Sequence, residues 1–388
     1  MGVFIPGDKL SHLKEYKYKS DDRSLLTKFI LKKFWVKFEC IFPLWMAPNM
    51  VTLSGLFFII GAVLLVFYYD PHLNQPSPWW TYLVYAAAMF FYQTFDACDG
   101  IHARKTGQSG PLGELFDHCI DAINTTLSVI VFGSVYQLGW GWKLWLAQFA
   151  TLCNFYLSTW EEFHTHQLYL SYFSGPVEGI WLLIFFYCLT AYLGAETWSS
   201  EAFVLDLSAI DLSSEFPVSM TDTSFAGGAV MLIYNIYSAW SNAMDYHKTQ
   251  AGKFEASKGL LPFFVFYASN FALLLLEPTI IQKMGFAVVI TIGSTIAFAV
   301  GRIIIAHLTK QSFPLINAPM FIPLIQYGLI NVLTKVYGLS FDLVIGPIVW
   351  CGLGLALGLH AWFVVDIVYD ITSYLDIWAL TIKHKKVE

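Results

Sequence analysis

The chain has 388 residues, a length that would suit two or three ordinary soluble domains. Its composition excludes that class, because 56% of the residues are hydrophobic and only 13% are charged, whereas a soluble domain carries about 25% charged residues. The mean hydropathy of +0.56 also excludes a disordered chain. A net charge of -6 excludes a broadly basic surface, so we expect no nucleic-acid partner. The composition indicates a polytopic membrane protein.

Residues 1–45 form a predicted N-terminal segment before the first long apolar stretch. Within it, Ser24 can cap a helix whose apolar residues recur at helical spacing as far as Phe38. Lysines occupy much of the remaining helix surface: Lys28, Lys32, Lys33 and Lys37. A basic amphipathic helix beside a membrane span is typical of a helix in the headgroup layer. A gate for a lipid substrate is the alternative.

About ten stretches are long and apolar enough to cross a bilayer, which takes about 20 residues each. They cover residues 47–69, 79–98, 113–138, 142–160, 176–195, 224–244, 259–277, 279–307, 317–335 and 342–366. The predicted fold class is all-α, a polytopic membrane protein of about ten transmembrane helices with an N-terminal amphipathic helix at the interface.

Charge predicts how these spans are oriented. With a cytosolic N-terminus, every Lys and Arg falls on the cytosolic side except Lys143, Lys283 and Lys335. By the positive-inside rule, both termini and the chemistry near them should face the cytosol. The last residues, 385–388, read Lys-Lys-Val-Glu and resemble a dilysine retrieval signal, so we expect the endoplasmic reticulum membrane, with the Golgi as the alternative.

Four aspartates flank the turn between the second and third predicted spans. Asp96 and Asp99 are three residues apart, and Asp117 and Asp121 are four apart, so each pair shares one helix face. Glycines and a proline within 107–111 favour an antiparallel reversal that brings the two faces together. Such carboxylates repel one another unless a cation lies among them. Their hard oxygen ligands favour Mg²⁺, Mn²⁺ or Ca²⁺, and two ions suit phosphoryl transfer.

The same stretch reads DxxDGxxAR, then eight residues, then GxxxDxxxD, and it resembles the signature of the CDP-alcohol phosphatidyltransferase family. The fixed positions are Asp96, Asp99, Gly100, Ala103, Arg104, Gly113, Asp117 and Asp121. The resemblance extends along nearly the whole chain and is greatest to the fungal choline and ethanolamine phosphotransferases. It implies a six-helix catalytic bundle over 46–245, with four further helices and a tail over 246–388 that shape a lipid chamber or a homodimer contact.

The resemblance implies an enzyme that transfers phosphocholine from CDP-choline to the hydroxyl of 1,2-diacylglycerol, giving phosphatidylcholine and CMP. CDP-ethanolamine is the alternative donor. Asp96, Asp99, Asp117 and Asp121 would hold two Mg²⁺ ions, with Mn²⁺ as a possible substitute. Arg104 should contact phosphate oxygens through its planar guanidinium group.

Small and amide side chains near the signature are the predicted nucleotide contacts. Gly100, Ala103 and Gly113 lack bulk and would admit the cytidine nucleotide against the backbone. Asn49, at the start of the first span, would contact the CDP moiety by resemblance; a helix N-cap is its structural alternative.

His118 is the predicted general base, because a base needs a pKa near neutral and reach to the attacking hydroxyl. Glu114, one turn earlier, could orient its imidazole. Choline and ethanolamine members of the family carry a histidine at this position. Where other branches lack it, the last aspartate is invoked, so Asp121 is the fallback base.

The cytosolic end of the fourth span offers a predicted site for the choline headgroup. A quaternary ammonium favours an aromatic wall with an anion nearby, and Trp160, Glu161 and Glu162 supply both, beside Tyr156. For the aromatic side chains, an interfacial belt is the alternative.

Two other classes compete with the phosphotransferase. An intramembrane prenyltransferase also binds a diphosphate through Mg²⁺ and aspartates, but it would carry aspartate pairs in two separate repeats. A cation transporter predicts interrupted helices and an internal repeat. The sequence has a single acidic cluster and no convincing repeat.

Overall fold

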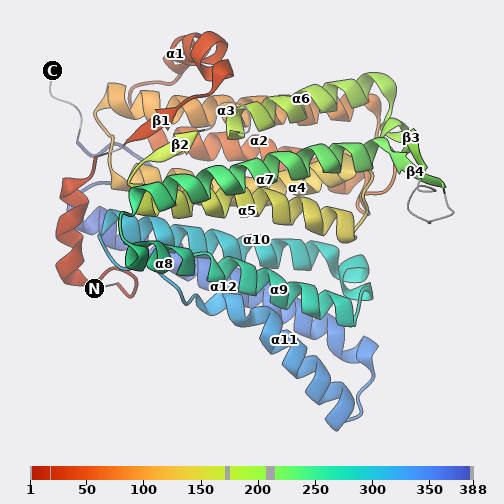
Figure 1. Cartoon of the computed structure of the whole chain (residues 1–388). Coiled ribbons are helices and arrows are strands. Elements are labelled where there is room, and N and C mark those ends of the chain that lie inside the picture. The colour runs from red at the N-terminus through yellow and green to blue at the C-terminus, as the bar shows by residue number, and fades with distance from the viewer. Residues whose placement is uncertain (1, 18, 171–174, 207–214, 385–388) are drawn as a thin grey trace.

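The computed structural model describes residues 2–17, 19–170, 175–206 and 215–384. Its long helices run side by side along one direction (Figure 1). The helices are α1 (Lys32–Phe38), α2 (Pro48–Tyr69), α3 (Trp79–Thr106), α4 (Pro111–Val135), α5 (Trp142–Thr165), α6 (Pro176–Leu193), α7 (Met220–Tyr246), α8 (Gln250–Lys258), α9 (Leu261–Leu276), α10 (Thr279–Leu308), α11 (Ile322–Asn331) and α12 (Phe341–Leu375). The predicted retrieval signal at 385–388 lies outside the described residues.

The all-α polytopic class is confirmed. Among the described residues, six helical segments are long and apolar enough to cross a membrane: α2, α4, α6, α8 with α9, α10 and α12. The other predicted spans also lie on helices, namely α3, α5, α7 and α11 with the π-helical turn Val332–Val336 that follows it. The count of ten membrane crossings stays a prediction.

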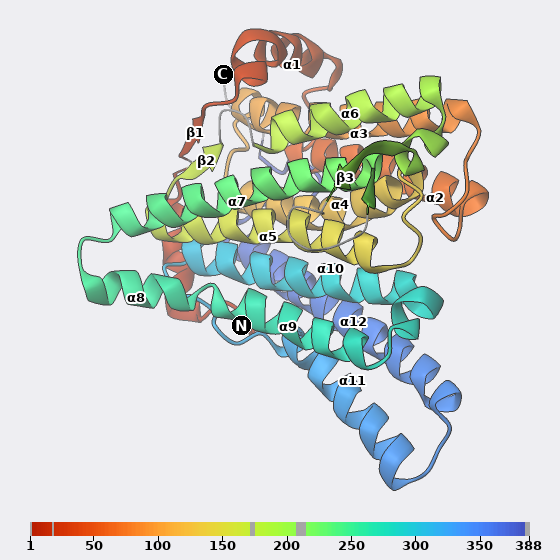
Figure 2. The same ribbon diagram turned by 45° about the vertical axis from the view of Figure 1, so that its right-hand side comes forward.

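Two small sheets add to the helices, and the sequence analysis did not predict them. β1 (Ser20–Asp22) pairs in parallel with β2 (Leu168–Leu170), which fastens the N-terminal segment to the chain that follows α5. β3 (Glu201–Asp206) and β4 (Glu215–Ser219) form an antiparallel hairpin. The hairpin lies at the end of the bundle opposite the N-terminal segment (Figures 1 and 2).

The N-terminal segment lies against the last turns of α12. Gly2 N–H donates to the carboxylate of Asp370 at 3.0 Å, and Val3 N–H donates to Asp366 at 2.8 Å. The 3₁₀ helix Gly7–Glu15 follows, and Glu15 pairs with Lys310 at the end of α10 at 2.5 Å. The start of the chain and the end of α12 therefore share one end of the bundle.

The amphipathic helix predicted near Ser24 is present. Ser24 Oγ accepts from Thr27 N–H at 3.1 Å, and a π-helical turn, Thr27–Leu31, leads into α1. Trp35 is buried in a cluster with Cys98 of α3. All four predicted lysines are exposed. In Figure 1, α1 is seen nearly end-on while the long helices cross the view, so it runs across their direction.

The C-terminal helices pack into the same cores as the preceding ones. Buried residues of α5, α7, α9, α10 and α12 share one hydrophobic cluster, and Cys119 of α4 shares another with α10 and α12. The predicted boundary at residue 246, between the catalytic bundle and the C-terminal helices, stays a prediction. In the structure the helices on either side of it are packed together.

Close contact between α4 and α10 depends on glycine. A Cβ at Gly293 of α10 would overlap the side chain of Thr126 of α4. A Cβ at Gly301 would lie 2.6 Å from Cε1 of Phe363 in α12. The absence of side chains at these positions lets three helices approach where α4 carries the predicted site residues.

We expect Gly293→Ala to destabilise the protein by about 1–3 kcal/mol, because the added methyl group overpacks this contact. Gly354→Ala in α12 is the matched control, since its Cβ would meet no atom within 4 Å and it gains the same helix propensity. The measurement is the thermal unfolding midpoint in detergent. An equal midpoint for both variants would contradict the packing argument.

Candidate active site

The turn between α3 and α4 brings the signature residues together. α3 ends at Thr106 and is capped by Gly107, whose φ of 70° is left-handed and suits glycine. Gln108 N–H donates to the Ala103 carbonyl at 2.8 Å, which closes the helix end. α4 begins at Pro111, a residue favoured in a first helical turn. The two helices therefore run antiparallel, as the sequence predicts.

Three of the four predicted aspartates form one cluster. Asp96, Asp99 and Asp117 each offer a carboxylate oxygen, and these oxygens lie within 4.8 Å of one another. We call these three residues the aspartate cluster. Among the described residues, Oδ1 of Asp96 and Oδ1 of Asp117 are buried without a hydrogen-bond partner. Unpartnered hard oxygens from crowded carboxylates suit a divalent cation.

Hydroxyl groups from neighbouring helices hold two aspartates. Thr52 of α2 donates a hydrogen bond to Asp99, and Tyr92 of α3 donates one to Asp121. Asp121 lies outside the aspartate cluster, so its predicted role as a fourth ligand stays a prediction. The sequence analysis missed Thr52 and Tyr92. Tyr92 could have been found, since it lies one helical turn before Asp96.

The predicted nucleotide contacts gather around the same turn. Arg104 is exposed, and its Nη1 lies 3.5 Å from where a Cβ on Gly100 would be. The arginine therefore lies along its own helix over Gly100. Oδ1 of Asn49 lies 3.9 Å from where a Cβ on Gly113 would be. Ala103 is half-buried in the same last turns of α3.

Asn49 is not a helix cap, so that alternative is wrong. The N-cap of α2 is Ala47, which has an extended backbone, and Pro48 opens the helix. Asn49 Nδ2 instead donates to the Ala379 carbonyl at 2.8 Å. This bond leaves Oδ1 of the amide directed to the side of Gly113.

His118 is buried beside a carboxylate of α5. Its Nε2 lies 3.7 Å from Oε2 of Glu162, and Nδ1 is without a partner among the described residues. Glu114, predicted to orient this ring, accepts a 2.6 Å hydrogen bond from the Tyr16 hydroxyl. The structure thus brings Glu162 to His118, and the orienting role of Glu114 stays a prediction. The sequence contains no signal for the contact of Tyr16 with Glu114, because the two residues are 98 positions apart.

The aromatic residues of the predicted headgroup site are part of the core. Trp160 is fully buried, and its Nε1–H donates to the Ala256 carbonyl at 2.9 Å. Tyr156 is 1% exposed and donates to the Gly259 carbonyl at 2.8 Å. The interfacial-belt alternative is therefore wrong for these two side chains. Contact of Trp160 with a headgroup stays a prediction.

The two glutamates of this segment differ in their surroundings. Glu161 is 5% exposed and accepts a 2.6 Å hydrogen bond from Asn242 Nδ2 of α7. Glu162 is 3% exposed, and its Oε2 is without a hydrogen-bond partner among the described residues. A buried carboxylate without full hydrogen bonding is costly. Of these two glutamates, Glu162 is therefore the one whose carboxylate would be stabilised by a cationic or hydrogen-bonding ligand.

Comparisons with known proteins agree with this geometry. The CDP-alcohol phosphatidyltransferase family model matches residues 45–209. Cholinephosphotransferase 1 of Saccharomyces cerevisiae is 49% identical over 100% of both chains. Choline/ethanolaminephosphotransferase 1 of the same yeast is 48% identical over 100% of both. Choline/ethanolaminephosphotransferase 1 of Arabidopsis thaliana is 33% identical over 99% of both.

The matched region contains the aspartate cluster, His118 and Glu162, and the similarity to these relatives spans the full chain. The chain is therefore a multi-pass membrane protein that belongs to the CDP-alcohol phosphatidyltransferase family.

Proposed function

We propose that this protein transfers phosphocholine from CDP-choline to the hydroxyl of 1,2-diacylglycerol, forming phosphatidylcholine and releasing CMP. The observation that carries this proposal is the aspartate cluster at the turn between α3 and α4, since α4 also carries the buried His118 and this ring lies 3.7 Å from a buried, incompletely bonded glutamate. The names of the relatives that align over the whole chain support the choice of substrates.

The aspartate cluster would hold the divalent ions of the reaction, with Asp121 as a further ligand. Two Mg²⁺ ions, or Mn²⁺ in their place, would neutralise the diphosphate and stabilise the charge that develops on CMP. The donor set fits this role, because carboxylate oxygens are the ligands that such ions prefer.

The other signature residues would bind the nucleotide. Arg104 extends over Gly100 and can present its guanidinium group to phosphate oxygens. Gly100, Ala103 and Gly113 leave room for the nucleotide close to the helix backbone. The amide nitrogen of Asn49 donates to the Ala379 carbonyl. The amide oxygen stays available as an acceptor on the side of Gly113.

His118 would accept the proton of the diacylglycerol hydroxyl. The hydroxyl oxygen forms a bond to the phosphorus that bears choline, and the bond from that phosphorus to the bridging oxygen breaks. CMP leaves with the electron pair, and the proton passes to the imidazole. Glu162, at 3.7 Å from Nε2, can stabilise the imidazolium that forms. Asp121 is the fallback base.

Glu161 and Glu162 would also supply negative charge for the quaternary ammonium group, with Trp160 behind them. Ethanolamine is the second candidate headgroup, because relatives at 48% and 33% identity are named choline/ethanolaminephosphotransferases. Family membership favours neither the prenyltransferase nor the cation transporter.

We also propose that the protein resides in the endoplasmic reticulum membrane as a homodimer, with both termini and the active site facing the cytosol; the Golgi is the alternative location. The distribution of Lys and Arg supports this orientation. The contacts of Gly2 and Val3 with α12 agree with it, since they join the N-terminal segment to the end of the last helix. The homodimer rests on the family resemblance.

We expect Asp99→Asn to lower kcat at least about 100-fold, because it removes charge where the diphosphate must be neutralised. A chelator should abolish CMP release by the wild type, and Mg²⁺ should restore it. Asp342→Asn is the control, since that exposed carboxylate pairs with Lys283 at 3.1 Å away from the site. The assay is diacylglycerol-dependent CMP release from CDP-choline. Full activity in chelator would contradict the proposed role of the aspartate cluster.

His118→Gln should lower kcat by about 10²–10⁴-fold through loss of the general base, while the KM for CDP-choline stays near the wild-type value. His72→Gln, at an exposed position between α2 and α3, is the control. Near-normal turnover of His118→Gln would contradict the assignment of His118 as the base and would favour the fallback, Asp121.

Side-by-side turnover of CDP-choline and CDP-ethanolamine in defined lipid tests headgroup choice. We expect the higher kcat/KM with CDP-choline, because a quaternary ammonium favours an aromatic wall with an anion nearby and the full-length relative at 49% identity is named a cholinephosphotransferase. A higher value with CDP-ethanolamine would favour the alternative function.

A further inference from the structure

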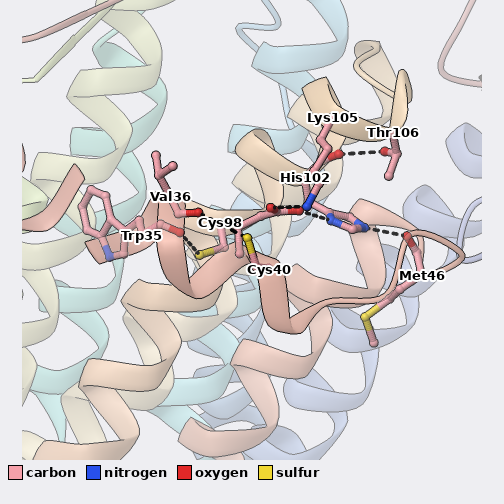
Figure 3. A network of polar contacts seen from close by, with 9 residues as sticks. Trp35, Val36, Cys40, Met46, Cys98, His102, Lys105 and Thr106 are labelled. Carbon is pink, nitrogen blue, oxygen red and sulfur yellow. Dashed lines mark hydrogen bonds and ion pairs between the residues drawn. The ribbon is translucent and has the colours of Figure 1, made fainter. Parts of the chain in front are cut away.

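A buried ion-pair network joins the amphipathic N-terminal segment to the last turns of α3 (Figure 3). Its centre is Glu39 of the 3₁₀ helix Glu39–Ile41, which is 2% exposed. Nδ1 of His102 lies 2.7 Å from Oε1 of Glu39, and Lys105 Nζ donates to Oε2 at 2.8 Å. One carboxylate therefore holds α3 at two points.

His102 extends the network to the chain that leads into α2. The ring is fully buried, and its Nε2 lies 2.9 Å from the carbonyl oxygen of Met46. The two ring nitrogens therefore face a carboxylate oxygen on one side and a backbone carbonyl oxygen on the other. His102 thus bridges the segment around Glu39 and the residue just before α2.

Both oxygens of the buried Glu39 carboxylate have a partner on α3. Burial by itself raises the pKa of Glu39, but the hydrogen bonds from Lys105 and His102 outweigh burial and hold that pKa below its usual value. If one member of a buried ion pair is removed, the charge of the other member is left uncompensated. The network is therefore a rigid attachment whose geometry depends on every member.

The attachment is adjacent to the residues of the proposed reaction. His102 follows Asp99 by three residues and precedes Arg104 by two, and Lys105 follows Arg104 directly. Arg104 itself is exposed and lies at the end of a helix, where backbone order is weakest. The network connects this turn by polar contacts to the chain before α2.

We propose that Glu39 is a positioning residue, which acts through His102 and Lys105 to hold Asp99 and Arg104 in the geometry that the diphosphate requires. This inference rests on the function proposed above. It assigns a role in turnover to a residue outside the signature, on the segment that we expect to lie in the headgroup layer.

The test compares Glu39→Gln with Glu15→Gln in the full-length protein. Glu15 is a matched control, because it also pairs with a lysine and a histidine, Lys310 and His12, but at an exposed position without a bond to α3. For Glu39→Gln we expect about a tenfold fall in kcat, since small displacements of reacting groups cost rate steeply. The KM for CDP-choline should stay within about twofold, and the Mg²⁺ concentration for half-maximal rate should rise. Glu15→Gln should match the wild type.

A double-variant comparison separates positioning from general stability. If Glu39 acts through His102, the double variant with Glu39→Gln and His102→Gln should have a kcat no lower than that of the more impaired single variant. Lys105→Gln, at a partly exposed position, keeps the buried contact of Glu39 with His102 and should raise the Mg²⁺ requirement less than Glu39→Gln.

Two outcomes would overturn the inference. One is a folded Glu39→Gln enzyme with wild-type kcat and Mg²⁺ dependence. The other is a Glu39→Gln protein that does not fold while Lys105→Gln has wild-type kinetics, which would make the network purely structural. Absence of CMP release by the wild type would instead refute the proposed function.

Discussion

Carboxylates are crowded at the turn between α3 and α4, and the packing of the surrounding helices must oppose their repulsion. Oxygens of Asp96, Asp99 and Asp117 lie within 4.8 Å of one another, and two unit charges 4 Å apart repel by about 4 kcal/mol at the dielectric typical of protein sites. The fold must hold these groups together against that repulsion. The same repulsion would favour a divalent cation among these carboxylates, as the proposed function requires.

Segments far apart in sequence converge on this end of the bundle. The chain after α12 reaches α2 through the bond of Asn49 to Ala379, and the turn after α3 through the bond of Gln108 to the His384 carbonyl. The N-terminal segment contacts α4 through Tyr16 and α12 through Gly2 and Val3. The two ends of the described chain thus surround the site that the signature helices form.

α5 carries the two glutamates of the proposed headgroup site, and its position depends on packing. Trp160 and Tyr156 donate to backbone carbonyls at Ala256 and Gly259, and a Cβ on Gly259 would lie 2.8 Å from the Trp160 ring. These contacts fix the turn of α5 that carries Glu161 and Glu162. The aromatic residues therefore hold the glutamates in position from within the core, and Glu162 is directed to His118.

The membrane class, the helices and the aspartate signature could be predicted from the sequence, because hydropathy and residue spacing along one helix are local properties. Asp96 and Asp99 share a face by their spacing alone, and Gly107 and Pro111 indicate the reversal. Four contacts became visible only in the folded chain: Glu162 lies near His118, Tyr16 bonds Glu114, Asn49 bonds Ala379, and Glu39 bonds His102. Each of these contacts joins residues on different elements, and their proximity depends on how the helices pack, which no periodicity within a single segment encodes.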